Sequence, residues 1–318
     1  MRAVENAFDL YAKGQVTAPK ILGIHINNGG FHIKAGVLTL ERTYFAAKTN
    51  SNFPDNRKQH GLPTIQGVII VCDGDNGRPL ALMDSMEITI IRTGAATGVA
   101  AKYLAKADAK TITICGCGNQ GMISLKAIMK VRQPEKVYAF DIDKDQAEKF
   151  CKNFSEKISI IPLAINELKT ALRQSEIVVT CTTSKQPFIL TEDIMPGTFI
   201  AAVGADSEDK QEIESRLIAS NKLVVDLAEQ CAGIGELHHA LQNKQMQVTD
   251  VYAGLGEIIA GQKPGRISNE EIIIFDSTGT ALQDVAAAAI VYEKALNNGV
   301  GMVMDFGEME NAIMIPGF

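Results

Sequence analysis

The spacing of hydrophobic positions divides the chain into two parts with different predicted architectures. Between residues 20 and 84, apolar and polar positions alternate in short segments, which are separated by turn clusters such as Asn28-Gly29-Gly30. Alternation with a period of two and Asn-Gly turns predict antiparallel strands joined by hairpins. The expected strands are 21–26, 31–37, 44–49, 64–72 and 79–84.

From Lys110 onward, β-branched segments alternate with helical patterns. Such alternation predicts a parallel sheet with right-handed crossovers, so the fold class is α/β: a Rossmann-type doubly wound sheet beside a β-rich α+β domain. The expected strands are 111–115, 136–140, 159–162, 176–180, 198–203, 222–226 and 272–275. The expected helices are 122–130, 145–154, 166–173 and 212–219.

Two Ala-rich helices, at 89–107 and 281–296, flank the parallel part and are expected to pack together and tie the domains to each other. The predicted domains are therefore 1–95, completed by 280–318, and a cofactor domain at 96–279. An amphipathic helix starts at Met1 itself. Since a domain rarely begins inside its first helix, we expect residues upstream of this numbering to be missing.

Composition narrows the function classes. The chain has 318 residues and a net charge of −6, with no basic tract, so a nucleic-acid partner is not expected. No leader opens the chain and no apolar run reaches about 18 residues, which predicts a cytoplasmic protein that does not enter a membrane. Six cysteines without a CxxC pair predict reduced thiols and no metal role.

The segment from Thr111 to Gly121 is the strongest chemical signal. Here Gly116 permits a tight turn, Gly118 lets the backbone approach a pyrophosphate, and Gly121 lets the helix pack closely on the strand. The N–H groups at the helix start, at Asn119, Gln120 and Gly121, then face the phosphates. A glycine turn without a ligand is the alternative interpretation.

Asp141 ends the next predicted strand, 20 residues after Gly121. A carboxylate at this distance is expected to bind a ribose hydroxyl and to repel a 2′-phosphate. No Arg or Lys directly follows Asp141, so NAD is the expected cofactor rather than NADP.

Ligands of doubly wound sheets bind beyond the carboxyl ends of the strands. The residues at those ends that suit a nicotinamide are Thr182, Thr183, Val203 and Ser277. Asp206 also follows a strand and is a candidate acid/base. Helix N-capping is the alternative for Ser277 and Thr278, and a bland cap or loop role is the alternative for Asp206.

The β-rich part offers cations. Lys48 follows two alanines, and Arg92 starts the first Ala-rich helix; either is a solvated charge or a partner of a substrate carboxylate. His32 and Lys34 are two residues apart in a predicted strand and therefore face the same side, which is either solvent or a substrate pocket.

Taken together, these segments resemble the ornithine cyclodeaminase/mu-crystallin family nearly end to end. The similarity rests on the glycine loop and on Ile91-Arg92-Thr93-Gly94-Ala95-Ala96, Val203-Gly204-Ala205-Asp206 and Asp276-Ser277-Thr278-Gly279. The resemblance implies a homodimer whose β-rich domain carries the substrate site and the dimer interface. It also implies that Lys48 and Arg92 hold the substrate carboxylate and that Asp206, with Lys48, is catalytic. His32 falls where the family has an arginine, and Lys34 is its candidate replacement as a substrate-binding residue.

The leading hypothesis is an NAD(H)-dependent oxidoreductase that acts on the C–N bond of a small amino or imino acid. An amino-acid cyclodeaminase that uses NAD catalytically is one alternative. A non-catalytic small-ligand binder similar to mu-crystallin is another. The sequence does not identify the side chain of the substrate.

Overall fold

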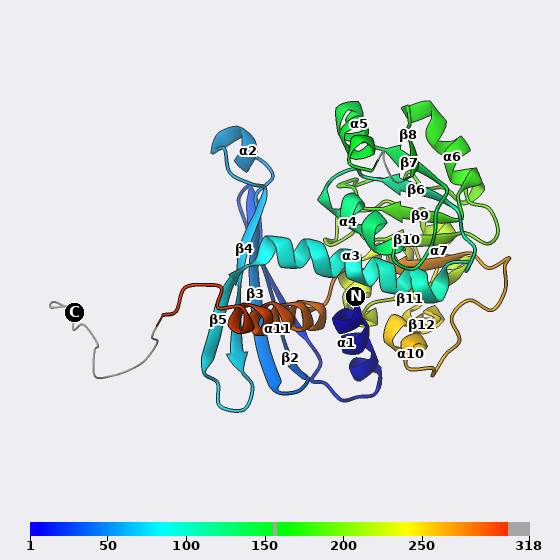
Figure 1. Ribbon diagram of the computed structural model, residues 1–318. Coiled ribbons are helices and arrows are strands. Elements are labelled where there is room, and N and C mark those ends of the chain that lie inside the picture. Colours follow the sequence, from blue (N-terminus) through cyan, green and yellow to red (C-terminus); the bar gives the residue numbers. More distant parts are fainter. Residues whose placement is uncertain (155–157, 305–318) are drawn as a thin grey trace, which may run out of the picture.

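The structure of the protein is a computed structural model that describes residues 1–154 and 158–304 (Figure 1). Within these residues the first part of the chain forms an antiparallel meander of five strands in the order β1-β2-β3-β4-β5. Its elements are β1 (Lys20–Ile26), β2 (Gly29–Thr39), β3 (Thr43–Asn52), the short α2 (Asn56–Gln59), β4 (Ile65–Asp73) and β5 (Pro79–Asp84).

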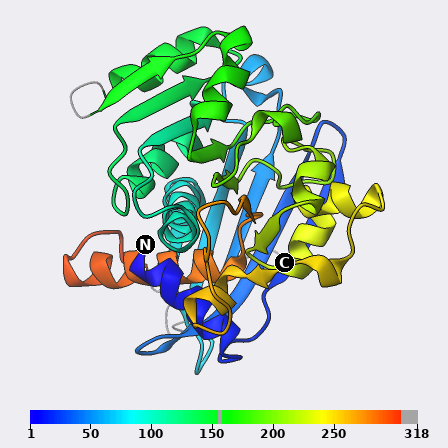
Figure 2. The same cartoon turned by 90° about the vertical axis from the view of Figure 1, so that its right-hand side faces the viewer.

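Three helices pack around this sheet: α1 (Arg2–Ala12), α3 (Ser85–Leu104) and α11 (Ala281–Asn297). The last of these lies against β2 and β3 and also contacts α1 and α3, so the predicted contact between the two Ala-rich helices is present. Figure 2 shows α3 end-on near the middle of the molecule. No helix in the described residues has both the length and the apolar composition to cross a membrane.

The second sheet is parallel, with eight strands in the order β12-β11-β13-β10-β9-β6-β7-β8 in the described part of the chain. Its strands are β6 (Thr111–Cys115), β7 (Lys136–Phe140), β8 (Ser159–Pro162), β9 (Ile177–Thr180), β10 (Phe199–Ala202), β11 (Lys222–Val225), β12 (Ala253–Gly254) and β13 (Ile273–Asp276). The chain runs outward from β6 to β8 and then returns to place β9 on the other side of β6. This reversal is the topological switch point at which doubly wound sheets bind ligands, and it confirms the predicted fold class.

Helices cover both faces of the parallel sheet (Figure 1). They are α4 (Asn119–Ile128), α5 (Lys144–Lys152), α6 (Leu168–Gln174), α7 (Ser215–Ala219), α8 (Ala228–Ile234), α9 (Glu236–Gln242) and α10 (Leu255–Ile259).

Several helix bounds differ from those predicted, and two of the differences have a local reason. α3 begins four residues earlier than expected, because the Asp84 side chain caps it by accepting from the Met86 N–H at 2.7 Å. The helix predicted at 212–219 begins only at Ser215, because Ile213 forms a bridge with Ile189. The predicted domain ranges stay a prediction, and their residues 305–318 lie outside the described part.

The inward face of β2 and β3 changes character along its length. Near one end, Leu38, Tyr44 and Ala46 are buried against α11. Toward the other end the same face presents Lys34, paired in register with Lys48, and His32, paired with Asn50. Alternation keeps all these residues on one side of the sheet. The sheet therefore supplies core contacts at one end and polar groups at the other.

Candidate active site

The turn from β6 into α4 has the geometry that a dinucleotide requires. Gly116 has φ +101°, a conformation that side-chain-bearing residues rarely adopt. A Cβ on Gly121 would lie 2.1 Å from the Gly116 carbonyl oxygen, so only glycine permits this close helix–strand approach. A Cβ on Gly118 would meet nothing within 4 Å, which leaves that stretch of backbone open to a ligand. The loop therefore fits a pyrophosphate at the helix start.

Asp141 lies next to this loop, where a ribose-binding carboxylate is expected. Its Oδ2 accepts from the Cys117 N–H at 2.8 Å and its Oδ1 from the Asp143 N–H at 3.0 Å. These bonds fix the carboxylate between the end of β7 and the glycine loop. The position agrees with the interpretation made from sequence spacing, and the role itself stays a prediction.

Two buried acids bond to the loops after β9 and β13. The sequence marked Asp226 only by its place at a strand end, and it gave Glu212 no role. Glu212 Oε1 accepts from the Thr182 N–H at 2.6 Å. Asp226 accepts from the Gly279 N–H at 2.6 Å and from the Thr278 hydroxyl at 3.1 Å. Helix capping by Ser277 or Thr278 is thus wrong, because Thr280 is the N-cap of α11 and both hydroxyls bond to Asp226.

Two further acids continue this buried set. Glu236 accepts from the backbone N–H groups of Glu212 and Ile213, and Asp276 accepts from that of Leu237. Burial raises the pKa of Asp276 to about 7 and also raises the pKa values of Glu212 and Glu236. Positions at the ends of predicted strands marked Asp226 and Asp276 in the sequence. Nothing in the sequence pattern marks Glu212 or Glu236 as buried.

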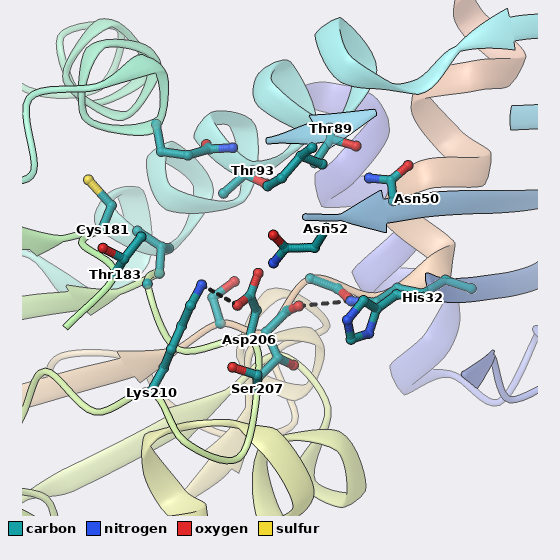
Figure 3. A pocket seen from close by; sticks show the side chains of 18 of the residues that line it. His32, Asn50, Asn52, Thr89, Thr93, Cys181, Thr183, Asp206, Ser207 and Lys210 are labelled. Atoms are coloured by element: carbon teal, nitrogen blue, oxygen red, sulfur yellow. Dashed lines mark hydrogen bonds and ion pairs between the residues drawn. The ribbon is translucent and has the colours of Figure 1, made fainter. Parts of the chain in front are cut away.

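A cavity of about 260 Å³ is lined by strands of the antiparallel sheet and by the loops that follow β9, β10 and β13 of the parallel sheet (Figure 3). It brings together most of the predicted site residues: His32, Lys34, Lys48, Arg92, Gln120, Thr182, Thr183, Val203, Asp206 and Ser277. The glycine-loop residues Gly116, Gly118, Asn119 and Gly121, and Asp141, do not line it. The substrate candidates and the nicotinamide candidates therefore share one cavity, which the phosphate candidate Gln120 also lines, and the other phosphate candidates and Asp141 do not line it.

Lys48 and Arg92 meet at a third residue that the sequence interpretation did not identify. Asp284 Oδ2 forms an ion pair with Lys48 Nζ at 2.7 Å, and Asp284 Oδ1 forms another with Arg92 Nε at 2.9 Å. All three side chains are buried, so neither cation is the solvated surface charge of the alternative interpretation. Arg92 Nη1 also donates to Gln283 Oε1 at 3.2 Å.

The electrostatics of this trio follow from its burial. Desolvation lowers the pKa of Lys48 to about 7; the Asp284 carboxylate acts against this, while the neighbouring charges of Arg92 and Lys34 add to it. Burial alone would raise the pKa of Asp284, but the two cations hold it below its ordinary value. Asp284 therefore stays ionised between them.

Lys34 and His32 face the cavity rather than open solvent. The Lys34 ammonium donates to the backbone oxygens of Thr278 at 3.0 Å and Gly279 at 2.6 Å. Burial lowers the pKa of Lys34, and the Arg92 charge adds to that effect. Burial also lowers the pKa of the half-buried His32, against the attraction of Asp206. His32 is therefore predominantly neutral at neutral pH.

Asp206 lies at the opposite wall of the cavity, in the loop after β10, and is exposed. Lys210 Nζ contacts its Oδ1 at 2.6 Å, as the dashed line in Figure 3 shows. Asp206 does not cap a helix, since the next one, α7, begins at Ser215. Asp206 and the buried cations thus line the same cavity, Asp206 from the loop after β10 and the cations from β3 and α3.

Comparison with known proteins gives a consistent picture. Residues 1–299 match the model of the ornithine cyclodeaminase/mu-crystallin family. The chain is 39% identical to the alanine dehydrogenase of Archaeoglobus fulgidus over 306 residues, which cover 96% of this chain and 93% of that protein. Among solved structures, an archaeal alanine dehydrogenase dimer with bound NAD superposes with a TM-score of 0.90, at 39% identity and with 96% and 93% of the two chains covered. The Δ1-pyrroline-2-carboxylate reductase of Thermococcus litoralis, in complex with NADH and L-proline, gives 0.88 at 36% identity, covering 95% and 94%.

Proposed function

The chain belongs to the ornithine cyclodeaminase/mu-crystallin family, and we propose that it is an NAD(H)-dependent oxidoreductase acting on the C–N bond of a small amino or imino acid. The relatives named above are a dehydrogenase of an amino acid and a reductase of a cyclic imino acid. The observation that carries the proposal is the buried Lys48–Asp284–Arg92 trio, which faces the strand-end loops across a single cavity.

The trio is suited to hold a carboxylate. Two positive charges and one negative charge leave one positive charge unbalanced when Lys48 is protonated. A substrate carboxylate restores the balance and accepts charge-assisted hydrogen bonds, which are stronger than neutral ones. Anchoring the substrate at this end fixes where its C–N bond lies, and such positioning lowers the barrier to reaction.

The opposite wall supplies proton transfer and the cofactor. A bound nicotinamide supplies or accepts the hydride. Its proposed neighbours are Thr182, Thr183, Val203 and Ser277, with the pyrophosphate at the glycine loop and the ribose at Asp141. Asp206 gives a proton to the substrate nitrogen, or takes one from it or from water, as the direction of reaction requires. His32 and Lys34 complete the substrate side of the cavity.

We also propose that the protein is a homodimer. Every residue of the edge strand β1 is exposed, although it contains Ile21, Leu22, Ile24 and Ile26. An exposed apolar edge strand is a template for association with another chain. Because one of the related structures is a dimer, a second copy of this chain is the expected partner, and a light-scattering mass of twice 34.3 kDa tests it. A cytoplasmic location is proposed as well, since all six cysteines are free thiols.

Absorbance at 340 nm tests the proposed reaction. The protein is incubated with NADH and either cyclic imino acids or 2-oxo acids with ammonia, and the reverse reaction is followed with amino acids and NAD. Net change in NADH is expected for an oxidoreductase. Ammonia release from a diamino acid without net NADH would identify a cyclodeaminase, and NADH binding without turnover of any of these substrates would identify a binder.

A further inference from the structure

Asp284 occupies an unusual place for a charged side chain. It lies in the first turn of α11, which packs on β2 and β3, and it is only 2% exposed. Each of its two carboxylate oxygens contacts a different cation, one from β3 and one from α3. The positive end of the helix dipole also favours a carboxylate at this position.

Without Asp284, no anion would hold Lys48 and Arg92 close to each other. Lys48 and Arg92 carry like charges in a buried place, where their repulsion is poorly screened. The other charged group facing Lys48 is Lys34 from β2, which is also a cation. Asp206 and Asp226 attract Lys34 but do not act on Lys48. Since a substrate carboxylate is present only during turnover, a permanent anion is needed between the cations at all other times.

Arg92 is held on several sides, which orients its free edge. Its Nε contacts Asp284, its Nη1 donates to Gln283, and its guanidinium lies against Gly279, where a Cβ would come within 2.1 Å of Nη1. No hydrogen-bond acceptor for Nη2 is found in the part of the chain that the structure describes. The remaining donor edge therefore faces the cavity that Arg92 lines.

We propose that Asp284 is the positioning residue of the carboxylate site: its two oxygens fix Lys48 and Arg92 at the separation that one substrate carboxylate bridges, and its charge favours the protonated form of Lys48 between turnovers. This inference rests on the proposed function, because it takes the ligand of the two cations to be the substrate carboxylate. Asp284 itself does not contact the reacting atoms.

The test compares Asp284→Asn with Glu293→Gln, which removes a charge from the same helix away from the cavity. Steady-state kinetics with an amino- or imino-acid substrate are measured from pH 6 to 9, together with NADH affinity by fluorescence. For Asp284→Asn, KM is expected to rise by about 10-fold or more, with kcat changed by less than about threefold. The pH at which KM begins to climb is expected to move downward, because Lys48 loses the anion that favours its protonated form.

Glu293→Gln should show neither change, and NADH affinity should be the same in all three proteins. A merely structural role for Asp284 would lower stability without moving the pH profile, so an unchanged KM and pH profile in folded Asp284→Asn overturns the inference. If that variant does not fold, Asp284→Glu is measured instead. This variant retains the charge but displaces the oxygens, so KM should rise while the pH profile stays in place, and an unchanged KM overturns the inference. Absence of turnover by the wild type with every substrate would refute the proposed function instead.

Discussion

The lowered pKa of Lys48 predicts that carboxylate binding weakens as the pH rises above neutrality. Lys48 is protonated below a pKa of about 7 in the free protein and neutral above it. A bound carboxylate favours the charged form and so raises this pKa. Binding should therefore be tightest below pH 7 and weaken about tenfold per pH unit until the pKa of the complex is reached.

The size of this loss of carboxylate affinity follows from the strength of the hydrogen bond between Lys48 and the carboxylate. A hydrogen bond between charged partners contributes about 1.5–3 kcal/mol, and one pKa unit corresponds to about 1.4 kcal/mol. The pKa of Lys48 should thus rise by about one to two units in the complex. Affinity is then expected to fall by about 10- to 100-fold between pH 7 and pH 9 and to level off above that range.

Competitive inhibition by propionate is the most direct assay, because its carboxylate stays ionised above pH 6 and it contains no amine that titrates. Its inhibition constant is measured at half-unit steps from pH 6 to 10 in wild type and in Lys48→Arg, whose guanidinium stays charged throughout. The inhibition constant should rise with pH above 7 in the wild type and should not depend on pH in the Lys48→Arg variant. A flat profile in the wild type, or the same slope in Lys48→Arg, would refute the assignment of this titration to Lys48.

Three further substitutions test other parts of the site. Asp206→Asn should lower turnover by about 10²–10⁴-fold while NADH still binds, and unchanged turnover would show that Asp206 is not the acid/base. Asp141→Ala should narrow the preference for NADH over NADPH, measured as the ratio of kcat/KM values; a wild type that prefers NADPH tenfold would contradict this interpretation. Gly279→Ala places a Cβ against Arg92 at a positive φ, whereas Gly77→Ala meets the same backbone penalty in open space. Both should lose about 1–2 kcal/mol of stability in thermal unfolding, but only the first should raise KM for the carboxylate substrate, and equal KM values would argue against close packing of Arg92 on that turn.

The sequence predicted those parts of the site that depend on local pattern. The glycine loop, Asp141 and the strand-end loops follow from a strand–turn–helix pattern whose signals lie within a few tens of residues. Asp206 was found because parallel strands place their carboxyl ends at one edge of the sheet. Lys48 and Arg92 gained their roles from a family resemblance, since a lone cation in a sequence is equally well a surface charge.

The residues that were missed depend on contacts between distant segments. Asp284 is a first-turn acid in an Ala-rich helix, which by pattern alone is an ordinary solvent-exposed helix start. Its burial results from the docking of α11 on β2 and β3. Glu212 was placed in a predicted helix, but its carboxylate holds the Thr182 backbone, and the chain there stays extended. The alternation of β2 likewise left open which side Lys34 faces.

The order in which Lys48, Arg92 and Asp284 are synthesised has a consequence for folding. Lys48 and Arg92 are synthesised early, and Asp284 arrives only after the whole parallel sheet. Until α11 docks, closing the antiparallel sheet would bury two like charges without their counter-ion, which is strongly unfavourable. We expect the segment made first to complete its folding last. A chain that ends before Ala281 should accordingly keep residues 20–84 open to proteases while the parallel sheet is already protected, and equal protection of both regions would contradict this folding order.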